Sequence, residues 1–323
     1  MTGKVPAGHY VVAGASGLVG RHALERLAGH PGVAVTALYR SSSRFRSRPG
    51  VSPVIVDLSD PLAARQAVPR ADYMLLFAGE VAPAPVLARD PVTPAINNLR
   101  ICINALEAAW HAGIRKVVWL SSTTVYPDAE GDITEDMAGH GHPPGNWYAM
   151  GCGMRYGESL CHAYANHPVR PMSCIALRPT LIYGAHSSFG DDAHFLPALV
   201  RRVAERRSPV EVWGDGEQRR DVVHGADVVE AALQAIERIE GFDTFNIGGG
   251  RSFSVNEVLA RLLAVDAYAD AKIVHLDNKP SSVKNRSFSI EKARRMLGYA
   301  PQIGLDEGLR RTLAWFRESA AAA

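Results

Sequence analysis

The 323-residue sequence has few cysteines and no long apolar run. Both shortages limit the cellular compartment and the membrane association that can be expected. The four cysteines include no Cys-x-x-Cys pair. Three of them fall in segments predicted as buried helix or strand, so free thiols in a reducing compartment are expected. No apolar run approaches the roughly 18–20 residues of a membrane span. The first residues carry one lysine and only a short apolar stretch, unlike a secretory signal. We therefore expect a cytoplasmic protein with no membrane partner.

An excess of charge of one sign is also missing. Lysine and arginine total 35 against 33 acidic residues, and the basic residues are scattered rather than gathered in a run. This distribution argues against a nucleic-acid partner. No metal site is expected either, because His140 and His142 have no third ligand at a suitable spacing and Pro143-Pro144 indicates a loop.

Strand and helix patterns alternate over residues 1–177. Strands are predicted at 9–13, 33–39, 51–56, 71–77, 116–120 and 173–177, and helices at 18–29, 96–111 and 153–165. This succession predicts an α/β fold with a Rossmann-type, doubly wound parallel sheet. Turn-rich loops become longer from residue 178. Residues 178–323 are therefore expected to form a smaller mixed α/β lobe, with some segments returning to the first domain.

A glycine-rich turn follows the first predicted strand and opens a helix. It reads Gly14-Ala15-Ser16-Gly17-Leu18-Val19-Gly20. The first glycine permits a tight turn, the second lets the backbone approach a pyrophosphate at the helix N-terminus, and the third allows close packing of helix and sheet. This spacing after the first strand of an alternating chain predicts a nicotinamide dinucleotide, contacted by Gly14, Ser16, Gly17, Leu18, Val19 and Gly20.

The second predicted strand ends without an acidic residue. The segment reads Leu38-Tyr39-Arg40-Ser41-Ser42-Ser43. NAD-binding sites usually place an acid here for the ribose hydroxyls, whereas an arginine accommodates the extra phosphate of NADP. Arg40 therefore favours NADP(H) over NAD(H).

Further segments complete a resemblance that extends along almost the whole chain. They are Asp57-Leu58, Phe77-Ala78-Gly79, Asn98 in INNLRICINALEAA, Ser122 in LSSTTVYP, RPTLIYG, and Arg220 in GDGEQRRDVVHGADV. Together they resemble the extended short-chain dehydrogenase/reductase family of nucleotide-sugar epimerases, dehydratases and ketoreductases. The resemblance implies that Ser122 is catalytic and that Arg220 holds the nucleotide phosphate, which arginine binds in a planar fork. It also implies cofactor contacts by Asp57, Leu58, Phe77, Ala78, Gly79 and Asn98.

The family's catalytic Tyr-x-x-x-Lys pair is incomplete in this sequence. In the family the tyrosine exchanges a proton with the sugar, and the lysine lowers the tyrosine's pKa and holds the nicotinamide ribose. If Tyr148 is the tyrosine, Cys152 takes the place of the lysine. An alignment on Glu158 instead puts Met150 and Met154 in the two places. Neither register supplies a lysine.

The first register is the one we predict. Tyr148 follows Ser122 by 26 positions, close to the family's separation, so Ser122 and Tyr148 are the predicted catalytic residues. Arg155 lies seven residues after Tyr148 and about 10 Å along a helix axis. We expect it to be a solvated helix residue rather than a substitute for the lysine.

Substrate contacts implied by the resemblance are Thr123, Thr124, His194, Arg220 and Lys279. Thr123-Thr124 replaces the Asp-Glu pair of the 4,6-dehydratases, which argues against dehydration. The segment that contains His194 resembles the GDP-fucose synthases, but Thr124 occupies their cysteine position, so double epimerisation is not expected. Leu181 replaces an asparagine that often binds the sugar phosphate in the family.

These observations predict an NAD(P)-dependent nucleotide-sugar epimerase or ketoreductase that transfers hydride at a ring carbon. The resemblance also implies a homodimer formed through the two long helices. The missing lysine leaves one alternative, a non-catalytic dinucleotide-binding protein that serves as a sensor or an assembly partner.

Overall fold

The computed structural model describes residues 3–42, 45, 47–80, 84–190, 193–276 and 286–321. Seven parallel strands form the central sheet, in the order β11-β7-β5-β4-β1-β2-β3. The strands are β1 (Gly8–Ala13), β2 (Val33–Tyr39), β3 (Val51–Ile55), β4 (Tyr73–Leu76), β5 (Lys116–Leu120), β7 (Ser173–Pro179) and β11 (Phe242–Ile247). The strand order reverses between β1 and β4, which makes a crevice at their carboxyl ends. The predicted fold class is confirmed.

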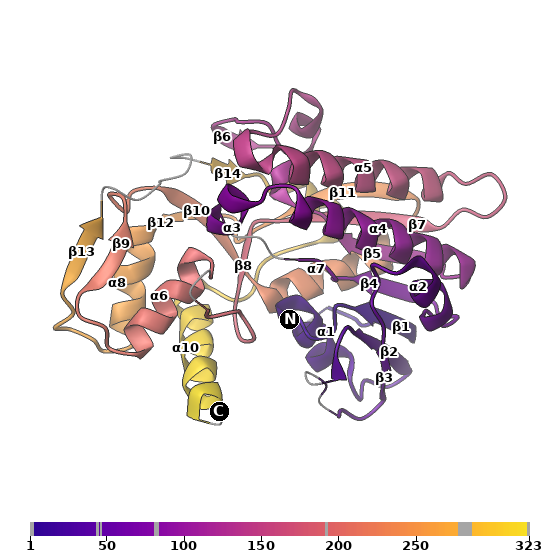
Figure 1. The fold of residues 1–323 in the computed structure, drawn as a ribbon. Helices are drawn as coiled ribbons and strands as arrows, with labels where there is room; N and C mark the ends of the chain where they lie inside the picture. The colour runs from indigo at the N-terminus through magenta and orange to yellow at the C-terminus, as the bar shows by residue number, and fades with distance from the viewer. Residues whose placement is uncertain are drawn as a thin grey trace.

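Helices cover both faces of this sheet (Figure 1). One layer contains α1 (Leu18–Leu27), α7 (Gly225–Arg238) and α9 (Glu291–Leu297). The other contains α2 (Pro61–Ala67), α4 (Thr93–His111) and α5 (Tyr148–Ala165). Because both faces are covered, the inner strands are nearly continuous apolar runs rather than alternating ones.

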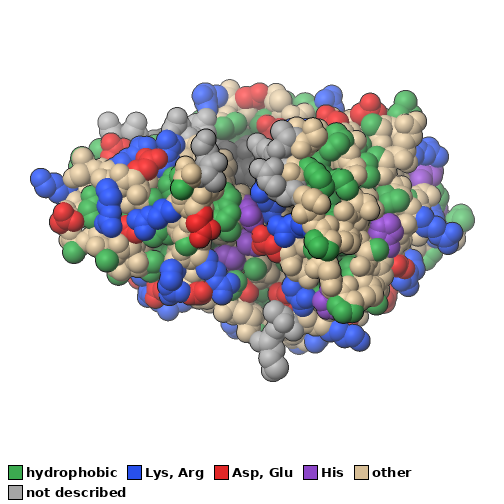
Figure 2. Space-filling model, turned by 90° about the horizontal axis from the view of Figure 1, so that it is seen from below, with side chains coloured by type: hydrophobic (Ala, Val, Ile, Leu, Met, Phe, Trp, Pro, Cys, Tyr) green, Lys and Arg blue, Asp and Glu red, His purple; other side chains and the backbone are tan. Residues whose placement is uncertain are grey.

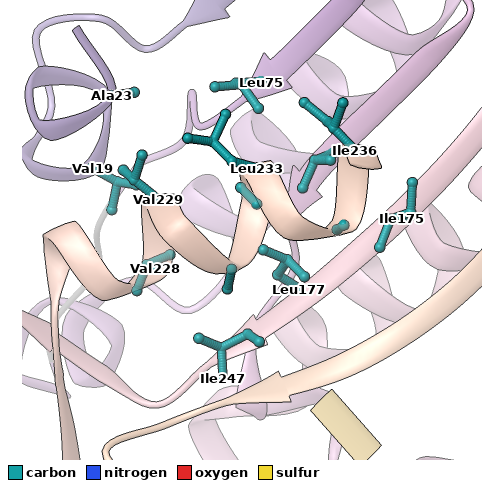
Figure 3. Packing of buried hydrophobic residues seen from close by; sticks show 14 of the residues in the cluster. Val19, Ala23, Leu75, Ile175, Leu177, Val228, Val229, Leu233, Ile236 and Ile247 are labelled. Atoms are coloured by element: carbon teal, nitrogen blue, oxygen red, sulfur yellow. The ribbon is translucent and has the colours of Figure 1, made fainter. Parts of the chain in front are cut away.

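Helix α7 packs on the sheet beside α1. Its residue Val229 lies near Val19 of α1 and Leu233 near Leu75 of β4, while Leu177 of β7 and Ile247 of β11 lie on the other side of the helix (Figure 3). Each fully buried side chain of this size contributes about 1.5–3 kcal/mol. Strand β11 and helix α7 both come from beyond residue 177, so the C-terminal half of the chain completes the first sheet and its cover.

The remaining elements form a smaller lobe beside the sheet, at the left of Figure 1. Its core lies among α6 (Phe195–Ala204), α8 (Val255–Val265) and α10 (Leu305–Ala321). Its strands are β8 (Leu181–Tyr183), β9 (Val210–Trp213), β10 (Arg219–His224), β12 (Ser252–Ser254) and β13 (Ile273–Leu276). Outside the lobe and the main layers lie β6 (Gly131–Ile133), which pairs with β14 (Arg286–Phe288), and the short helix α3 (Ala84–Arg89). The 3-10 turns near the site are η2 (Thr123–Val125), η3 (Glu135–Gly139) and η4 (Gly145–Trp147).

Helix α5 begins five residues earlier than the sequence predicts. Gly151 and Gly153 weaken the helical pattern there, because glycine is a poor helix former. Gly151 is nevertheless suited to its position, since a Cβ atom on it would stand 2.2 Å from the Thr124 carbonyl oxygen. Tertiary packing therefore outweighs local preference. Among the described residues, no helix combines the length and the apolarity that a membrane crossing requires.

Candidate active site

The glycine-rich turn lies at the point where the strand order reverses. Gly14 has a φ of +82°, and a Cβ atom on it would stand 2.6 Å from the backbone nitrogen of Ala78, which follows β4. A Cβ atom on Gly20 would stand 2.1 Å from the Gly14 carbonyl oxygen. Only glycine permits these close approaches, so β1, β4 and α1 meet tightly around the crevice.

The N-terminus of α1 opens onto this crevice. Gly17 is its N-cap residue, no side chain caps the helix, and its first turn contains no acid. Ser16 and Leu18 are half-buried, whereas Val19 packs in the core. An uncapped helix terminus without a carboxylate suits a pyrophosphate. The residues at this turn therefore fit a dinucleotide.

Arg40 and Asp57 lie near one another at the ends of two neighbouring strands, and both are exposed. The backbone N–H and hydroxyl of Ser59 lower the pKa of Asp57, and the charge of Arg40 lowers it further. Leu58 is buried, and its carbonyl oxygen accepts a hydrogen bond from Asn104 at 2.9 Å. An adenine ribose in this position would meet both a cation and a carboxylate.

Asn98 fixes the loop that follows β4, which begins with Phe77, Ala78 and Gly79. Its Oδ1 accepts a hydrogen bond from the backbone N–H of Glu80 at 2.6 Å, and its Nδ2 donates to the Glu80 carbonyl oxygen at 3.0 Å. The same Nδ2 lies 3.5 Å from the Met150 sulfur. The predicted cofactor residues from β1, β4 and α4 therefore meet at one edge of the sheet.

The structure places Met150 and Tyr148 differently. Met150 is only 5% exposed and packs against Leu87 and Ala95, facing α4. Tyr148, the first residue of α5, is 51% exposed, and its ring lies 5.9 Å from that of His142. Of the two residues, Met150 is the one that contacts the predicted cofactor residue Asn98.

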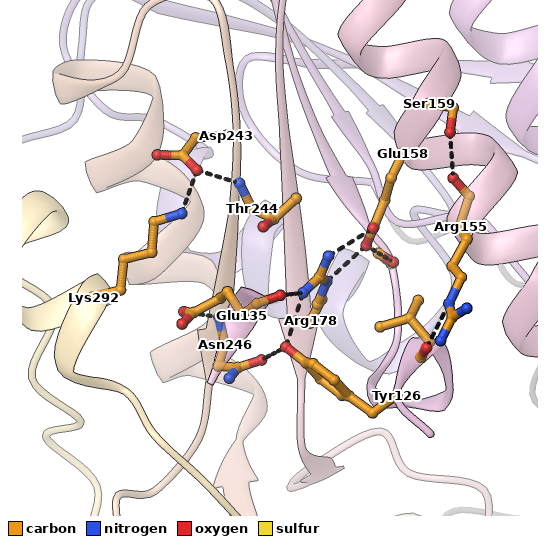
Figure 4. Close-up of polar contacts among 12 residues, drawn as sticks. Tyr126, Glu135, Arg155, Glu158, Ser159, Arg178, Asp243, Thr244, Asn246 and Lys292 are labelled. Carbon is orange, nitrogen blue, oxygen red and sulfur yellow. Dashed lines mark hydrogen bonds and ion pairs between the residues drawn. The ribbon is translucent and has the colours of Figure 1, made fainter. Parts of the chain in front are cut away.

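A buried polar network lies beneath this region (Figure 4). The sequence did not predict that its residues would interact with one another. Arg178 of β7 donates two hydrogen bonds to the Glu158 carboxylate of α5, at 2.7 and 2.8 Å. It also donates to the Tyr126 hydroxyl at 2.9 Å, and this hydroxyl donates to Asn246 Oδ1 of β11 at 2.5 Å. Ser121 donates to Glu158 as well. The network fixes α5 relative to β5, β7 and β11.

The charges of this network support each other. Burial alone would lower the pKa of Arg178, but the Glu158 carboxylate and Tyr126 outweigh burial and raise it. Burial raises the pKa of Tyr126 to about 12, so this hydroxyl remains protonated. A pair of charged residues spaced twenty positions apart gives no local signal in a single sequence, which explains why the pair was not predicted.

The predicted catalytic Ser122 lies at the end of β5. Its Oγ accepts a hydrogen bond from the backbone N–H of Thr124 at 3.1 Å and so caps η2. The Thr124 hydroxyl is buried and has no hydrogen-bond partner among the described residues. An unpaired buried hydroxyl is costly, and a ligand could satisfy it. Thr123 beside it is half-buried.

Two half-buried arginines adjoin on the substrate-lobe side. Burial lowers the pKa of Arg220 on β10, and the charge of Arg286 on β14 lowers it further. Arg286 donates a hydrogen bond to the Pro127 carbonyl oxygen at 3.0 Å. Because Pro127 follows the turn that Ser122 caps, Arg286 lies close to that turn. Like charges held together in a partly desolvated place favour a bound anion. Arg286 was not predicted, since no motif marks it.

The other predicted substrate contacts have different fates. His194 precedes α6 as its N-cap residue, and burial lowers the pKa of its imidazole. Leu181, which replaces the family's phosphate-binding asparagine and was not predicted as a contact, begins β8 and packs at the edge of the lobe core. Lys279 lies outside the described residues. In the described part of the chain, no group of three metal-ligating side chains could hold a metal ion.

The comparisons with known proteins agree with this geometry. A probable GDP-L-fucose synthase 1 of Oryza sativa is 30% identical over 260 residues, which cover 78% of this chain and 77% of the relative. GDP-L-fucose synthase 1 of Arabidopsis thaliana is also 30% identical, with 68% of each covered. The structure of MoeE5 in complex with UDP-glucuronic acid and NAD superposes with a TM-score of 0.79 at 27% identity, covering 96% of this chain and 99% of that one.

The fold and the cofactor residues together define an NAD(P)-binding enzyme of the extended short-chain dehydrogenase/reductase type. The sequence matches one family over residues 10–248, and the chain belongs to it: the NAD dependent epimerase/dehydratase family. This membership confirms the resemblance and supports the predicted enzyme rather than a non-catalytic binding protein.

Proposed function

We propose that this enzyme transfers hydride at a ring carbon of a nucleotide-linked sugar, with epimerisation or ketone reduction as the outcome. The adjoining arginines Arg220 and Arg286 are the observation that carries the proposal. A nucleotide sugar has a pyrophosphate, and arginine binds phosphate in a planar fork. Because Arg286 also contacts the Pro127 carbonyl, a pyrophosphate held here brings the sugar toward Ser122. The relatives named as GDP-L-fucose synthases support a substrate of this class.

The chain's own residues would bind and protonate the sugar. A bound nicotinamide would supply or accept the hydride. Ser122 and the unpaired hydroxyl of Thr124 would orient the reacting oxygen, and Tyr148 would exchange its proton. Because no lysine stands four residues after Tyr148, this proton exchange has no fixed cation to favour tyrosinate. The arrangement therefore favours donation to a carbonyl during reduction over abstraction from an alcohol.

NADP(H) is the cofactor that we propose over NAD(H). Arg40 is exposed at the end of β2, where the 2′-phosphate of NADP would lie. Its positive charge also lowers the pKa of the neighbouring Asp57, so a bound 2′-phosphate would meet a cation beside that carboxylate.

We further propose a cytoplasmic homodimer. The cysteines of the described chain are free thiols, which suits a reducing compartment. Tyr156 on α5 and Ile96 on α4 are 52% and 43% exposed, and an apolar contact with a second copy would cover such side chains.

Titration of GDP and UDP into the parent protein and Arg220→Ala tests the substrate site. Loss of a charge-assisted, bidentate contact costs about 1.5–3 kcal/mol, or roughly tenfold to a hundredfold in affinity. Arg219→Ala is the matched control, because Arg219 on the same strand pairs with Glu257 instead. Equal affinities for the parent and Arg220→Ala would reject Arg220 as a phosphate ligand. NADPH oxidation by a panel of keto-nucleotide sugars then tests turnover, and no turnover of any of them would reject reduction.

A further inference from the structure

Arg155 on α5 is not the solvated residue that the sequence suggests. Its Nε donates to the Val125 carbonyl oxygen at 2.7 Å, and its Nη1 donates to the Gly141 carbonyl oxygen at 2.7 Å. Its Nη2 is buried and has no partner among the described residues. No carboxylate of the described chain forms an ion pair with it, so the guanidinium interacts with backbone alone. Figure 4 shows Arg155 extending from α5 toward the segment that follows β5.

The two carbonyls belong to the two segments that carry the proposed catalytic residues. Val125 ends η2, the turn that Ser122 caps. Gly141 precedes His142 in the stretch that leads through η4 to Tyr148. Arg155 therefore connects both segments to one helix.

Both segments also pack directly against α5, at a second point besides Arg155. A Cβ atom on Gly151 would stand 2.2 Å from the Thr124 carbonyl oxygen and 2.6 Å from the Pro143 side chain. The start of α5 therefore touches both segments at once, and Arg155, one turn further along, bonds to both. Van der Waals contact at one end and hydrogen bonds at the other fix the spacing of the segments.

We propose that Arg155 is a positioning residue that holds the Ser122 turn and the Tyr148 segment at a fixed separation. This rests on the proposed function, in which Ser122 and Tyr148 act on one sugar oxygen. Arginine suits the task because its planar fork donates in two separate directions, whereas a lysine ammonium acts as a point charge. Misplacement of reacting groups by about 1 Å can reduce the rate by a hundredfold.

Hydrogen–deuterium exchange on the cofactor-bound protein tests the positioning without any need for turnover. In Arg155→Met, peptides covering residues 121–127 and 139–148 should exchange faster, while the peptide covering 10–24 should not change. Arg155→Lys should retain protection in at most one of the two segments. Arg261→Met is the control, because Arg261 makes an exposed ion pair with Asp306 in the other lobe. Unchanged exchange in both segments of Arg155→Met would overturn the proposal, as would faster exchange throughout the sheet.

Kinetics provide the second measurement on any substrate that the parent turns over. Arg155→Met should lower kcat by roughly tenfold to a hundredfold, with a smaller change in KM and an unchanged Kd for NADPH. A change confined to KM would contradict a positioning role. If the parent turns over nothing, the proposed function fails, and the exchange experiment still decides whether Arg155 holds the two segments.

Discussion

Tyr148 and Met150 lie two residues apart on α5, and they differ in what they can do. Tyr148 has an ionisable hydroxyl but is half exposed, and its ring lies beside His142. Met150 is buried next to Asn98 and cannot exchange a proton. Chemistry therefore favours Tyr148, and closeness to the cofactor residues favours the position of Met150.

Substitution of Tyr148 by phenylalanine distinguishes the two residues. General acid catalysis typically contributes 10²–10⁴-fold, so Tyr148→Phe should lower kcat by about this factor and leave the Kd for NADPH unchanged. Tyr156→Phe is the control, because Tyr156 is equally exposed on the same helix. If Tyr148→Phe keeps near-parental turnover, the Met150 register becomes the better alignment. A gain in rate for the double variant M150Y/M154K would then support it.

Arg40 determines the choice of cofactor in our proposal. Arg40→Ala should weaken NADPH binding roughly tenfold or more, because a charge-assisted contact to the 2′-phosphate is lost, and should barely change NADH binding. Calorimetry with both cofactors measures the difference. An equal loss for both cofactors, or a parental preference for NADH, would refute the assignment.

At the scale of elements, the features that arise from local chemistry were predictable from the sequence. Strands β2 and β5 were predicted with their observed bounds, since buried parallel strands are compact apolar runs between turns. The glycine spacing before α1 located the crevice because each glycine has its own steric reason there. Short strands such as β6 and β14 were not predicted, because three residues are too few to show alternation.

The site was predictable to a similar degree. Residues in motifs, such as Gly14 and Asn98, were found, whereas Arg286 and the Glu158–Arg178 pair were not. The latter depend on contacts between distant segments, about which a single sequence carries no information. Arg155 was misjudged for the same reason, since its partners are backbone carbonyls of other segments.

The close approach of α1 to the Gly14 turn can be tested by substitution of Gly20. In Gly20→Val, the new Cβ atom would meet a backbone oxygen at 2.1 Å that no rotamer change can move away. Overpacking of this kind costs about 1–3 kcal/mol, so urea unfolding should show a loss of that size together with much weaker NADPH binding. The control is Gly304→Val, because nothing lies within 4 Å of a Cβ at Gly304. Parental stability and cofactor affinity in Gly20→Val would contradict the close approach.

At the scale of the whole molecule, a histidine cluster lies where α1 meets elements of the C-terminal half. Glu25 of α1 accepts hydrogen bonds from His22 at 3.0 Å and from His186, beyond β8, at 2.8 Å. The His22 ring lies 5.1 Å from that of His224, which caps α7. Figure 2 shows histidines gathered in the hollow between the two halves of one face.

This cluster predicts weaker folding in acid. Burial, with the nearby His22 and Arg311, lowers the pKa of His224 to about 3, against about 6.5 in an unfolded chain. A lowered histidine pKa means that stability is complete above about pH 6.5 and falls as pH drops toward 3. Between pH 7.5 and 5.5 this histidine alone should cost about 1.4 kcal/mol. Urea unfolding of the parent and His224→Asn, which keeps a capping side chain, measures the difference.

The carboxyl group of Asp221 should change folding stability with pH in the opposite direction to His224. It therefore provides a control for the direction of the pH effect. Burial raises its pKa to about 7, so its contribution is complete below about pH 4 and is lost as pH rises toward 7. Asp221→Asn should therefore steepen the loss of stability on acidification, whereas His224→Asn should flatten it. The same slope in the parent and both variants would show that neither group is linked to folding.

The origin of β11 and α7 beyond residue 177 has a consequence for synthesis on the ribosome. When β7 has been completed at Pro179, it is an open edge strand, and helix α7, which packs against the sheet, has not yet been made. The sheet that carries the dinucleotide crevice therefore stays incomplete until about seventy further residues have been made, and its apolar edge and uncovered face are exposed in that interval. A nascent chain stalled between these points would be a substrate for chaperones, and a gene cut at that boundary would yield an aggregating fragment rather than a cofactor-binding domain.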